Sequence, residues 1–116
     1  MMEEFQVKQT PRVKFVAPGQ AQHAGLPTPP QTPNILSGLV VDQKGEILPG
    51  VIVVVKDNED NPVRAIKTNR LGQFSISTPL PNGVYGLELE KEGYEFDIIE
   101  IEAKGDIILP VEVKAK

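Results

Sequence analysis

Residues 81–96 read PNGVYGLELEKEGYEF, and this stretch decides the fold. Tyr85, Leu87 and Leu89 are spaced two residues apart, which places them on one face of a β-strand, while the residues between them point to the other face. The Pro-Asn-Gly before them is a turn sequence, because Asn and Gly tolerate positive φ and Pro fixes its own φ. The stretch therefore predicts a turn, a strand with three core residues, a glycine turn and a second strand.

Runs of the same kind recur about every ten residues from Ile35 to the end of the chain. Together they predict seven strands, over residues 35–42, 50–56, 63–68, 73–78, 84–90, 95–103 and 107–114. With no helical periodicity between them, the pattern is typical of an all-β protein, a seven-stranded Greek-key β-sandwich. The run VIVVV at 51–55 is apolar on both faces and is expected to be a central strand. A change of phase between Ile98 and Ile99 predicts a β-bulge.

The bulk composition limits the classes of function. The 116 residues fit one domain, and a core from 40% hydrophobic but only 5% aromatic residues must be aliphatic. Without cysteine the chain forms no disulfide, zinc–thiolate site or cysteine nucleophile. A net charge of −4 argues against nucleic-acid binding, and no apolar run approaches the ~20 residues of a membrane span. The acidic start MMEEFQVKQT is not a signal peptide, so the protein either stays where it is made or was cut from a longer exported chain.

Residues 1–34 differ in character from residues 35–116. Six of the eleven prolines lie in the first 34 residues, which predicts an extended tail and Pro-rich linker, with residues 17–34 as the linker proper. Residues 5–16 alternate as short strands do and carry Lys8, Arg12 and Lys14. With three Lys/Arg against two Glu, the tail is basic beside an acidic remainder. We expect 35–116 to fold without the tail. Residues 5–16, where ordered, are expected to pair with a sheet edge of the same chain or of a neighbour, and such pairing repeated head to tail makes a filament; a mobile tether is the alternative.

A set of motifs spread over residues 35–95 resembles one family. GLVVD at 38–42, LPGV at 48–51, TNRLGQFSI at 68–76, LPNGVYGL at 80–87 and GY at 93–94 resemble carboxypeptidase regulatory-like domains, which are small transthyretin-like (prealbumin-like), Ig-like sandwiches. The resemblance assigns structural roles, as turns or core aromatics, to a set of landmarks: Gly38, Asp42, Gly45, Gly50, Gly72, Phe74, Gly83, Tyr85, Gly93 and Tyr94. Tyr85 is expected to donate its hydroxyl to a backbone group at a strand corner.

Related surface-pilin domains of the collagen-adhesin B type share the Gly-x-Tyr-x-Leu ending. In them a lysine of the first strand bonds covalently to an Asn or Asp of the last, with a Glu nearby. The matching positions here fall in Val40-Val41 and at Leu89. Because neither residue type is present there, no internal isopeptide bond is expected.

The search for chemistry yields no catalytic, metal-binding or cofactor-binding residue. The single histidine, His23, lies in the linker, so no Ser-His-Asp or histidine–metal arrangement forms. Residues 57–61, DNEDN, resemble a calcium loop but have Pro62 where the loop needs glycine and Thr68 where it needs glutamate. We expect a polar hairpin turn there, with weak calcium binding as the minor alternative. The seven carboxylates between residues 88 and 102 are expected to form the solvated face of two strands.

The resemblance implies a non-enzymatic structural or interaction module, an accessory or surface domain of the bacterial cell envelope that acts as a spacer or protein-docking unit. The acidic strands and the loops at 57–61 and 69–72 are the surfaces it would offer to a protein partner. A second hypothesis is a carbohydrate-binding module, as related sandwiches bind starch on exposed Trp or Tyr, but Trp is absent and both Tyr are expected to be structural. A transthyretin-like hydrolase is the enzymatic alternative, and it depends on His and Arg clusters that this chain lacks.

Overall fold

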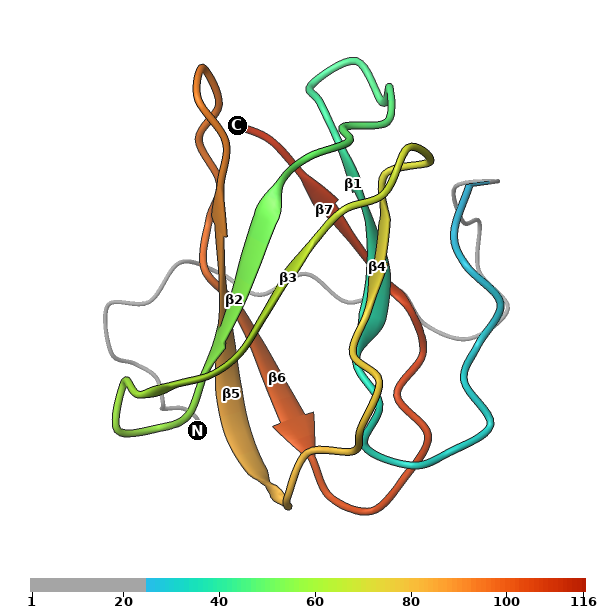
Figure 1. The fold of residues 1–116 in the computed structure, drawn as a ribbon, viewed down its shortest axis with the longest axis vertical. Coiled ribbons are helices and arrows are strands. Elements are labelled where there is room, and N and C mark those ends of the chain that lie inside the picture. The colour runs from blue at the N-terminus through green and yellow to red at the C-terminus, as the bar shows by residue number, and fades with distance from the viewer. Residues whose placement is uncertain (1–24) are drawn as a thin grey trace, which may run out of the picture.

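The computed structural model describes residues 25–116, which form seven strands in two facing sheets (Figure 1). The larger sheet has the order β3-β2-β5-β6 and the smaller one the order β4-β1-β7. The strands are β1 Ser37–Val41, β2 Ile52–Lys56, β3 Pro62–Lys67, β4 Gln73–Ser75, β5 Gly83–Glu90, β6 Ile99–Ala103 and β7 Val111–Lys114. All neighbours pair antiparallel except β1 and β7, which run parallel. The predicted seven-stranded β-sandwich is confirmed, while the Greek-key form of its connections stays a prediction.

The core lies between the two sheets and is mainly aliphatic. Alternation along β2 buries Val53 and Val55 completely and leaves Ile52 40% exposed. The position of β2 between β3 and β5 confirms that it is a central strand. On β5, Tyr85 and Leu87 are buried and Leu89 packs against the core from its edge, as their spacing predicted. The Tyr85 hydroxyl donates a hydrogen bond of 2.6 Å to the carbonyl of Pro81, which closes the turn before β5.

Several strands are shorter than the sequence predicted, and the largest difference lies before β6. The predicted strand 95–103 begins only at Ile99, because residues 95–98 lie outside the β5–β6 ladder. That ladder keeps one register from Gly83↔Ala103 to Leu87↔Ile99, so the predicted bulge at 98–99 is wrong. The change of apolar phase marks the start of the strand instead. A register shift does occur between Val55 and Lys56, where β2 meets β3.

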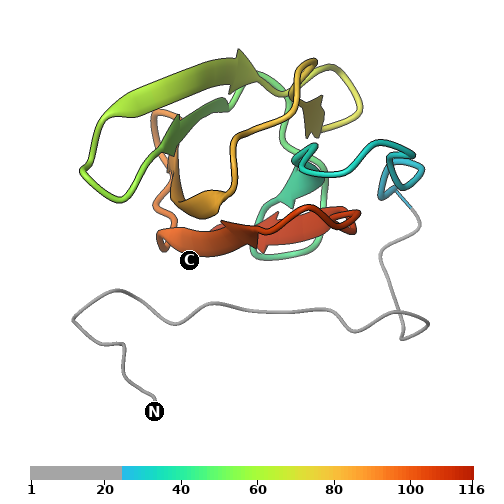
Figure 2. The same cartoon turned by 90° about the horizontal axis from the view of Figure 1, so that it is seen from below.

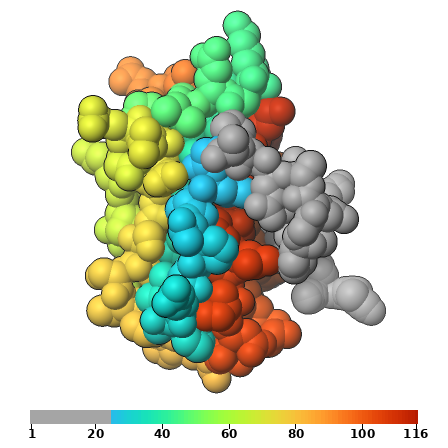
Figure 3. All heavy atoms as spheres, turned by 90° about the vertical axis from the view of Figure 1, so that its right-hand side faces the viewer, coloured from blue at the N-terminus to red at the C-terminus, as the bar shows by residue number. Residues whose placement is uncertain are grey.

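β1 is buried on both of its faces. Val40 packs into the core, so its neighbour Leu39 points to the opposite face of the small sheet, yet Leu39 has no exposed surface. Residues 25–34 lie along this outer face, as Figures 1 and 3 show in blue and cyan. Gln73, the register partner of Leu39, donates its side-chain amide to the carbonyl of Gly25 at 2.8 Å. The described part of the Pro-rich segment is thus packed against the sandwich, whereas residues 5–16 and the first part of the predicted linker lie outside the described residues.

Asn34 joins three parts of the chain at one end of the sandwich. Its side-chain nitrogen donates to the carbonyl of Leu80 at 2.8 Å and to Oδ1 of Asn82 at 2.9 Å. Its own Oδ1 accepts from the amide of Gly105 at 2.8 Å, in the connection between β6 and β7. The side chain is buried, and the backbone is left-handed with φ of 63°. An amide side chain at this position supplies both a donor and an acceptor and tolerates that φ.

We expect Asn34→Ala to lower the free energy of unfolding by about 2–4 kcal/mol, because it removes buried hydrogen bonds and places a Cβ residue in left-handed backbone. Asn34→Gly keeps the backbone conformation and loses only the side chain, so it should be more stable than Asn34→Ala by about 1 kcal/mol. Urea unfolding of the full chain measures both. Equal stability of both variants and the native chain would contradict this role.

Candidate functional site

Three hairpin turns share one hydrogen-bonded design. In the turns that begin at Asp42, Asp57 and Asn69, the side-chain Oδ1 of the first residue accepts the amides two and four residues later, at 2.8–3.0 Å. In each, the amide three residues later donates to the backbone carbonyl of the first residue. The fourth residue of each turn is left-handed: Gly45 with φ of 87°, Asp60 with 68° and Gly72 with 76°. This is a three-residue hairpin loop locked by its Asx side chain.

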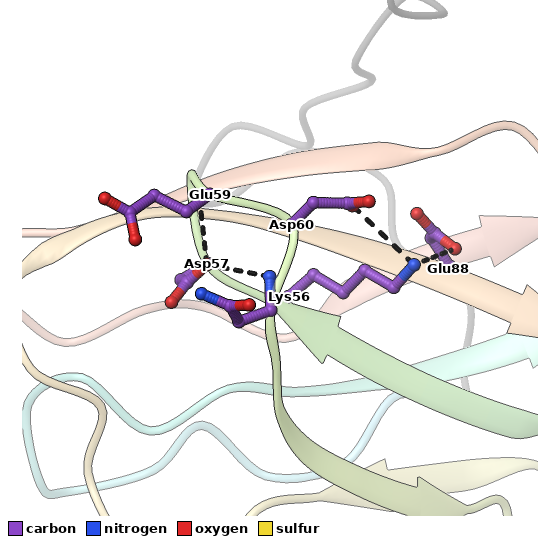
Figure 4. A network of polar contacts seen from close by, with 6 residues as sticks. Lys56, Asp57, Glu59, Asp60 and Glu88 are labelled. Carbon is purple, nitrogen blue, oxygen red and sulfur yellow. Dashed lines mark hydrogen bonds and ion pairs between the residues drawn. The ribbon is translucent and has the colours of Figure 1, made fainter.

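The Asp57 turn is the loop that resembles a calcium site. Oδ1 of Asp57 accepts two backbone amides, and hydrogen bonding to Asn61 holds the pKa of this carboxyl below its ordinary value. Lys56 places its Nζ 3.1 Å from Glu88 and 3.6 Å from Asp60 (Figure 4). The hydrogen bond with Glu88 raises the pKa of Lys56. The turn is a polar hairpin, as expected, and within residues 25–116 no three His, Cys, Asp or Glu side chains are grouped as metal ligands.

Leu71 projects from the third turn with 59% of its surface exposed. Ile47 is also exposed and lies beside this turn, since a Cβ on Gly72 would come within 3.0 Å of the Ile47 Cβ. Arg70 precedes Leu71 and is exposed. We call Ile47, Arg70 and Leu71 the Leu71 surface.

A second surface feature is a shallow concavity at the same end of the sandwich, with a volume of about 220 Å³. It is lined by Asp42, Gln43, Lys44, Glu46, Gly93, Tyr94 and Lys116. Tyr94 is 39% exposed here, whereas Tyr85 is buried, and the structural role expected of Tyr94 stays a prediction. Its backbone amide closes the Lys91–Tyr94 turn at 3.0 Å, and the turn carries the ring out to the surface.

The other landmarks lie where they shape the fold. Gly38 on β1 has room for no side chain, because a Cβ would collide with the carbonyl oxygen of Val111 and come within 2.8 Å of the Phe74 ring. Phe74 is buried in the core, as predicted. Gly83 has φ of 159° and starts β5.

Sequence reasoning passed over Thr68, Asn34 and Leu71 as individual residues. Thr68 is buried, donates to the carbonyl of Leu48 and accepts the amide of Val51, both at 2.8 Å. The Thr-Asn pair is part of the family motif in the sequence. The hydrogen bonds of Thr68 could not be predicted from it, because their partners lie 17 and 20 positions away. For Leu71 a signal did exist, because an apolar residue stands in a turn position where the two related turns have Lys44 and Glu59.

With this geometry established, comparison with known proteins identifies the family. The chain matches the family model of the carboxypeptidase regulatory-like domain over residues 35–108, well over half of its length. The chain therefore belongs to this family. A search of curated proteins finds no match.

Solved structures with a similar fold include a pilin subunit, the TIE protein and enzymes. The major pilin subunit of Bacillus cereus aligns with TM-score 0.61 and 17% identity over 71% of this chain and 28% of the pilin. The Bacillus anthracis TIE protein aligns with TM-score 0.54 and 23% identity over 72% of this chain and 17% of its own. The 5-hydroxyisourate hydrolase of Klebsiella pneumoniae aligns with TM-score 0.54 and 27% identity over 71% of this chain and 91% of the hydrolase. The chain thus spans only a small part of the pilin and of the TIE protein, and the fold is transthyretin-like.

The Asx turns predict a specific pH dependence. The pKa of Asp42 is lowered mainly by the hydrogen bond from the Glu46 amide, and that of Asp57 by the bond from Asn61. Their contribution to stability is therefore complete above the ordinary carboxyl pKa of about 3.9 and is lost as the pH falls through the lower folded value.

In the double variant Asp42→Asn/Asp57→Asn each turn keeps its acceptor oxygen and no longer titrates. We expect its free energy of unfolding to fall less steeply than that of the native chain between pH ~4 and pH ~2, and the two curves to converge at the acid end. The matched variant Asn69→Asp adds a third titrating turn and should steepen the fall. Urea unfolding at several pH values measures all three, and parallel curves would contradict this role of the turns.

Proposed function

We propose that this protein is a non-enzymatic interaction module, a β-sandwich that docks to another protein through the Leu71 surface. The observation that carries the proposal is the exposed Leu71 at the tip of a hydrogen-bonded turn. The family and the pilin subunit with a similar fold support a role as an accessory or spacer domain outside the cytoplasm.

The three Asx turns of the chain show whether the position of Leu71 requires leucine for folding. Lys44, Glu59 and Leu71 occupy the same place in the three turns, and each donates its amide to the Asx oxygen at 2.8–2.9 Å. The turn therefore accepts charged residues there, and folding does not require leucine. An apolar side chain held in a rigid turn loses little conformational freedom on binding, which favours its use as an anchor.

The neighbours of Leu71 indicate the chemistry of the partner. Ile47 extends the apolar contact area, and the exposed Arg70 next to Leu71 puts a positive charge at its border. A partner that fits has an apolar socket with Asp or Glu at its border.

A hydrolase role has less support, although a hydrolase and chlorocatechol dioxygenases share the fold. Fold alone does not carry an activity across. The only histidine of the chain is His23, and within residues 25–116 the polar clusters described above are turns and surface ion pairs.

Panning a displayed random-peptide library on the immobilised full chain tests the proposal. We expect enriched peptides with an apolar residue next to Asp or Glu, whose affinity falls at least about tenfold on Leu71→Lys, a change worth ~1.4 kcal/mol. Lys44→Leu, the reciprocal change in the related turn, should leave binding unchanged. Leu71→Lys should alter stability by less than ~0.5 kcal/mol, as surface changes do. Equal peptide binding by the native chain and Leu71→Lys would refute the proposal.

The concavity at Tyr94 favours carbohydrate binding as a second candidate function. An exposed ring can stack on a sugar, and the neighbouring side chains of Gln43, Lys44 and Glu46 offer hydrogen-bond donors and acceptors around it. The volume of about 220 Å³ suits one sugar unit rather than a chain.

Titration of the full chain with soluble oligosaccharides, followed by two-dimensional amide spectra, tests this candidate. We expect shifts confined to residues 42–46 and 93–94, and their loss in Tyr94→Ala. Tyr94→Phe keeps the ring and should retain most of the shifts. If no oligosaccharide shifts these amides, the carbohydrate hypothesis fails.

A further inference from the structure

We infer that residues 12–16 add a strand to the open edge of β6 in the same chain, extending the larger sheet to the order β3-β2-β5-β6-(12–16). Of the residues 5–16 expected to pair with a sheet edge, 12–16 would form the added strand, with their charged side chains on the outer face and their apolar side chains on the inner face. This pairing does not depend on docking at the Leu71 surface.

β6 offers an edge with two different faces. Among residues 25–116 it pairs only with β5, so its other edge has no strand partner. Glu100 and Glu102 point to the outer face of the sheet, while Ile99, Ile101 and Ala103 are buried on the inner face. An added strand must therefore bring positive charge to one face and apolar groups to the other.

Residues 12–16 read RVKFV and meet both requirements. In an extended strand Arg12 and Lys14 share one face, and Val13 and Phe15 share the other. Placed beside β6, the cations lie next to Glu100 and Glu102, and the apolar side chains continue the inner face beyond Ile101.

The remaining edges fit this segment less well. The edge of β3 begins with Pro62, which has no amide hydrogen, and Lys67 on its outer face would repel Arg12 and Lys14. Arg64, the register partner of Val55, puts a charge on the inner face, where the apolar side chains of the segment would lie. The β4 strand has only three residues, and Gln73 at its start binds Gly25. On β7 the outer positions alternate between Glu112 and Lys114, so half of the charge pairs are repulsive.

The tether is long enough for pairing within one chain. Gly25 lies over the outer face of the small sheet, and β6 and β7 run along the same side of the sandwich (Figure 2). The residue after β7 contacts the segment before β6, where the Lys116 amide donates to the Glu95 carbonyl at 2.8 Å. With strands about 4.8 Å and sheets about 10 Å apart, the path from Gly25 around β7 to β6 is about 20–25 Å. Residues 17–24 can span up to about 26–29 Å. The short tether also gives the segment a millimolar effective concentration at this edge, which favours its own chain over a second copy.

Engineered cysteine pairs test the inference, since the natural chain has no cysteine. Lys14→Cys is combined in the full chain with Glu100→Cys, with Glu102→Cys, or with Ala65→Cys on the β3 edge as the matched control. Under mild oxidation we expect an intramolecular disulfide with a β6 position and at most a tenth as much with Ala65→Cys. Disulfides that join two chains would overturn the pairing within one chain, and equal yields at the two edges would overturn the choice of β6.

Charge reversal gives a second readout without cysteines. Arg12→Glu/Lys14→Glu should speed hydrogen exchange of the outward β6 amides about tenfold, and adding Glu100→Lys/Glu102→Lys should restore their protection. A solution mass that stays that of one chain supports pairing within the chain. Exchange of β6 unchanged by the reversal, or a mass that grows with concentration and falls on the reversal, would refute it.

Discussion

The structure depends on the burial of β1 from both sides. Core side chains cover one face of this strand, and the other face carries Leu39, which is fully buried under the segment that leads into the domain. A strand in this position can hold apolar residues throughout, as the run ILSGLVV does. It is the central strand of the small sheet, pairing antiparallel with β4 and parallel with β7, so the first and last strands of the domain are hydrogen-bonded neighbours. Asn34 then fixes where the covering segment enters.

Rigid turns explain how a small aliphatic domain presents specific groups at its ends. Each Asx turn pairs its backbone groups within the turn, and the residue at its tip contributes its amide. The side chain of that residue is therefore not needed for the structure of the turn. Two of the three tips are charged and one carries Leu71. The three turns have the same backbone, so the leucine in place of a charged residue is what makes the third turn suited to docking.

The charges of the larger sheet are divided between its two edges. β3 carries Arg64 and Lys67, and β6 carries Glu100 and Glu102. Like charges oppose the pairing of two copies through the same edge, which protects the domain from uncontrolled association. A basic strand is accepted at β6 and disfavoured at β3, so the same charges that prevent aggregation also select a partner.

The sequence alone determined the class of fold, the number of strands, the turn positions and the inward faces of β2 and β5, because these follow from local alternation and from Gly, Asn and Asp at tight turns. It also pointed to Tyr85 as a buried residue with a bonded hydroxyl. The tertiary structure decided what alternation does not encode. Leu39 is buried because residues 25–34 fold back over the outer face of its sheet. Asn34 matters because it bonds residues 46 and 71 positions away, and Tyr94 is exposed because its turn projects beyond the sheet. The predicted bulge is wrong because a change of apolar phase occurs both where a strand bulges and where a strand has not yet begun. Only the pairing with β5 distinguishes the two cases.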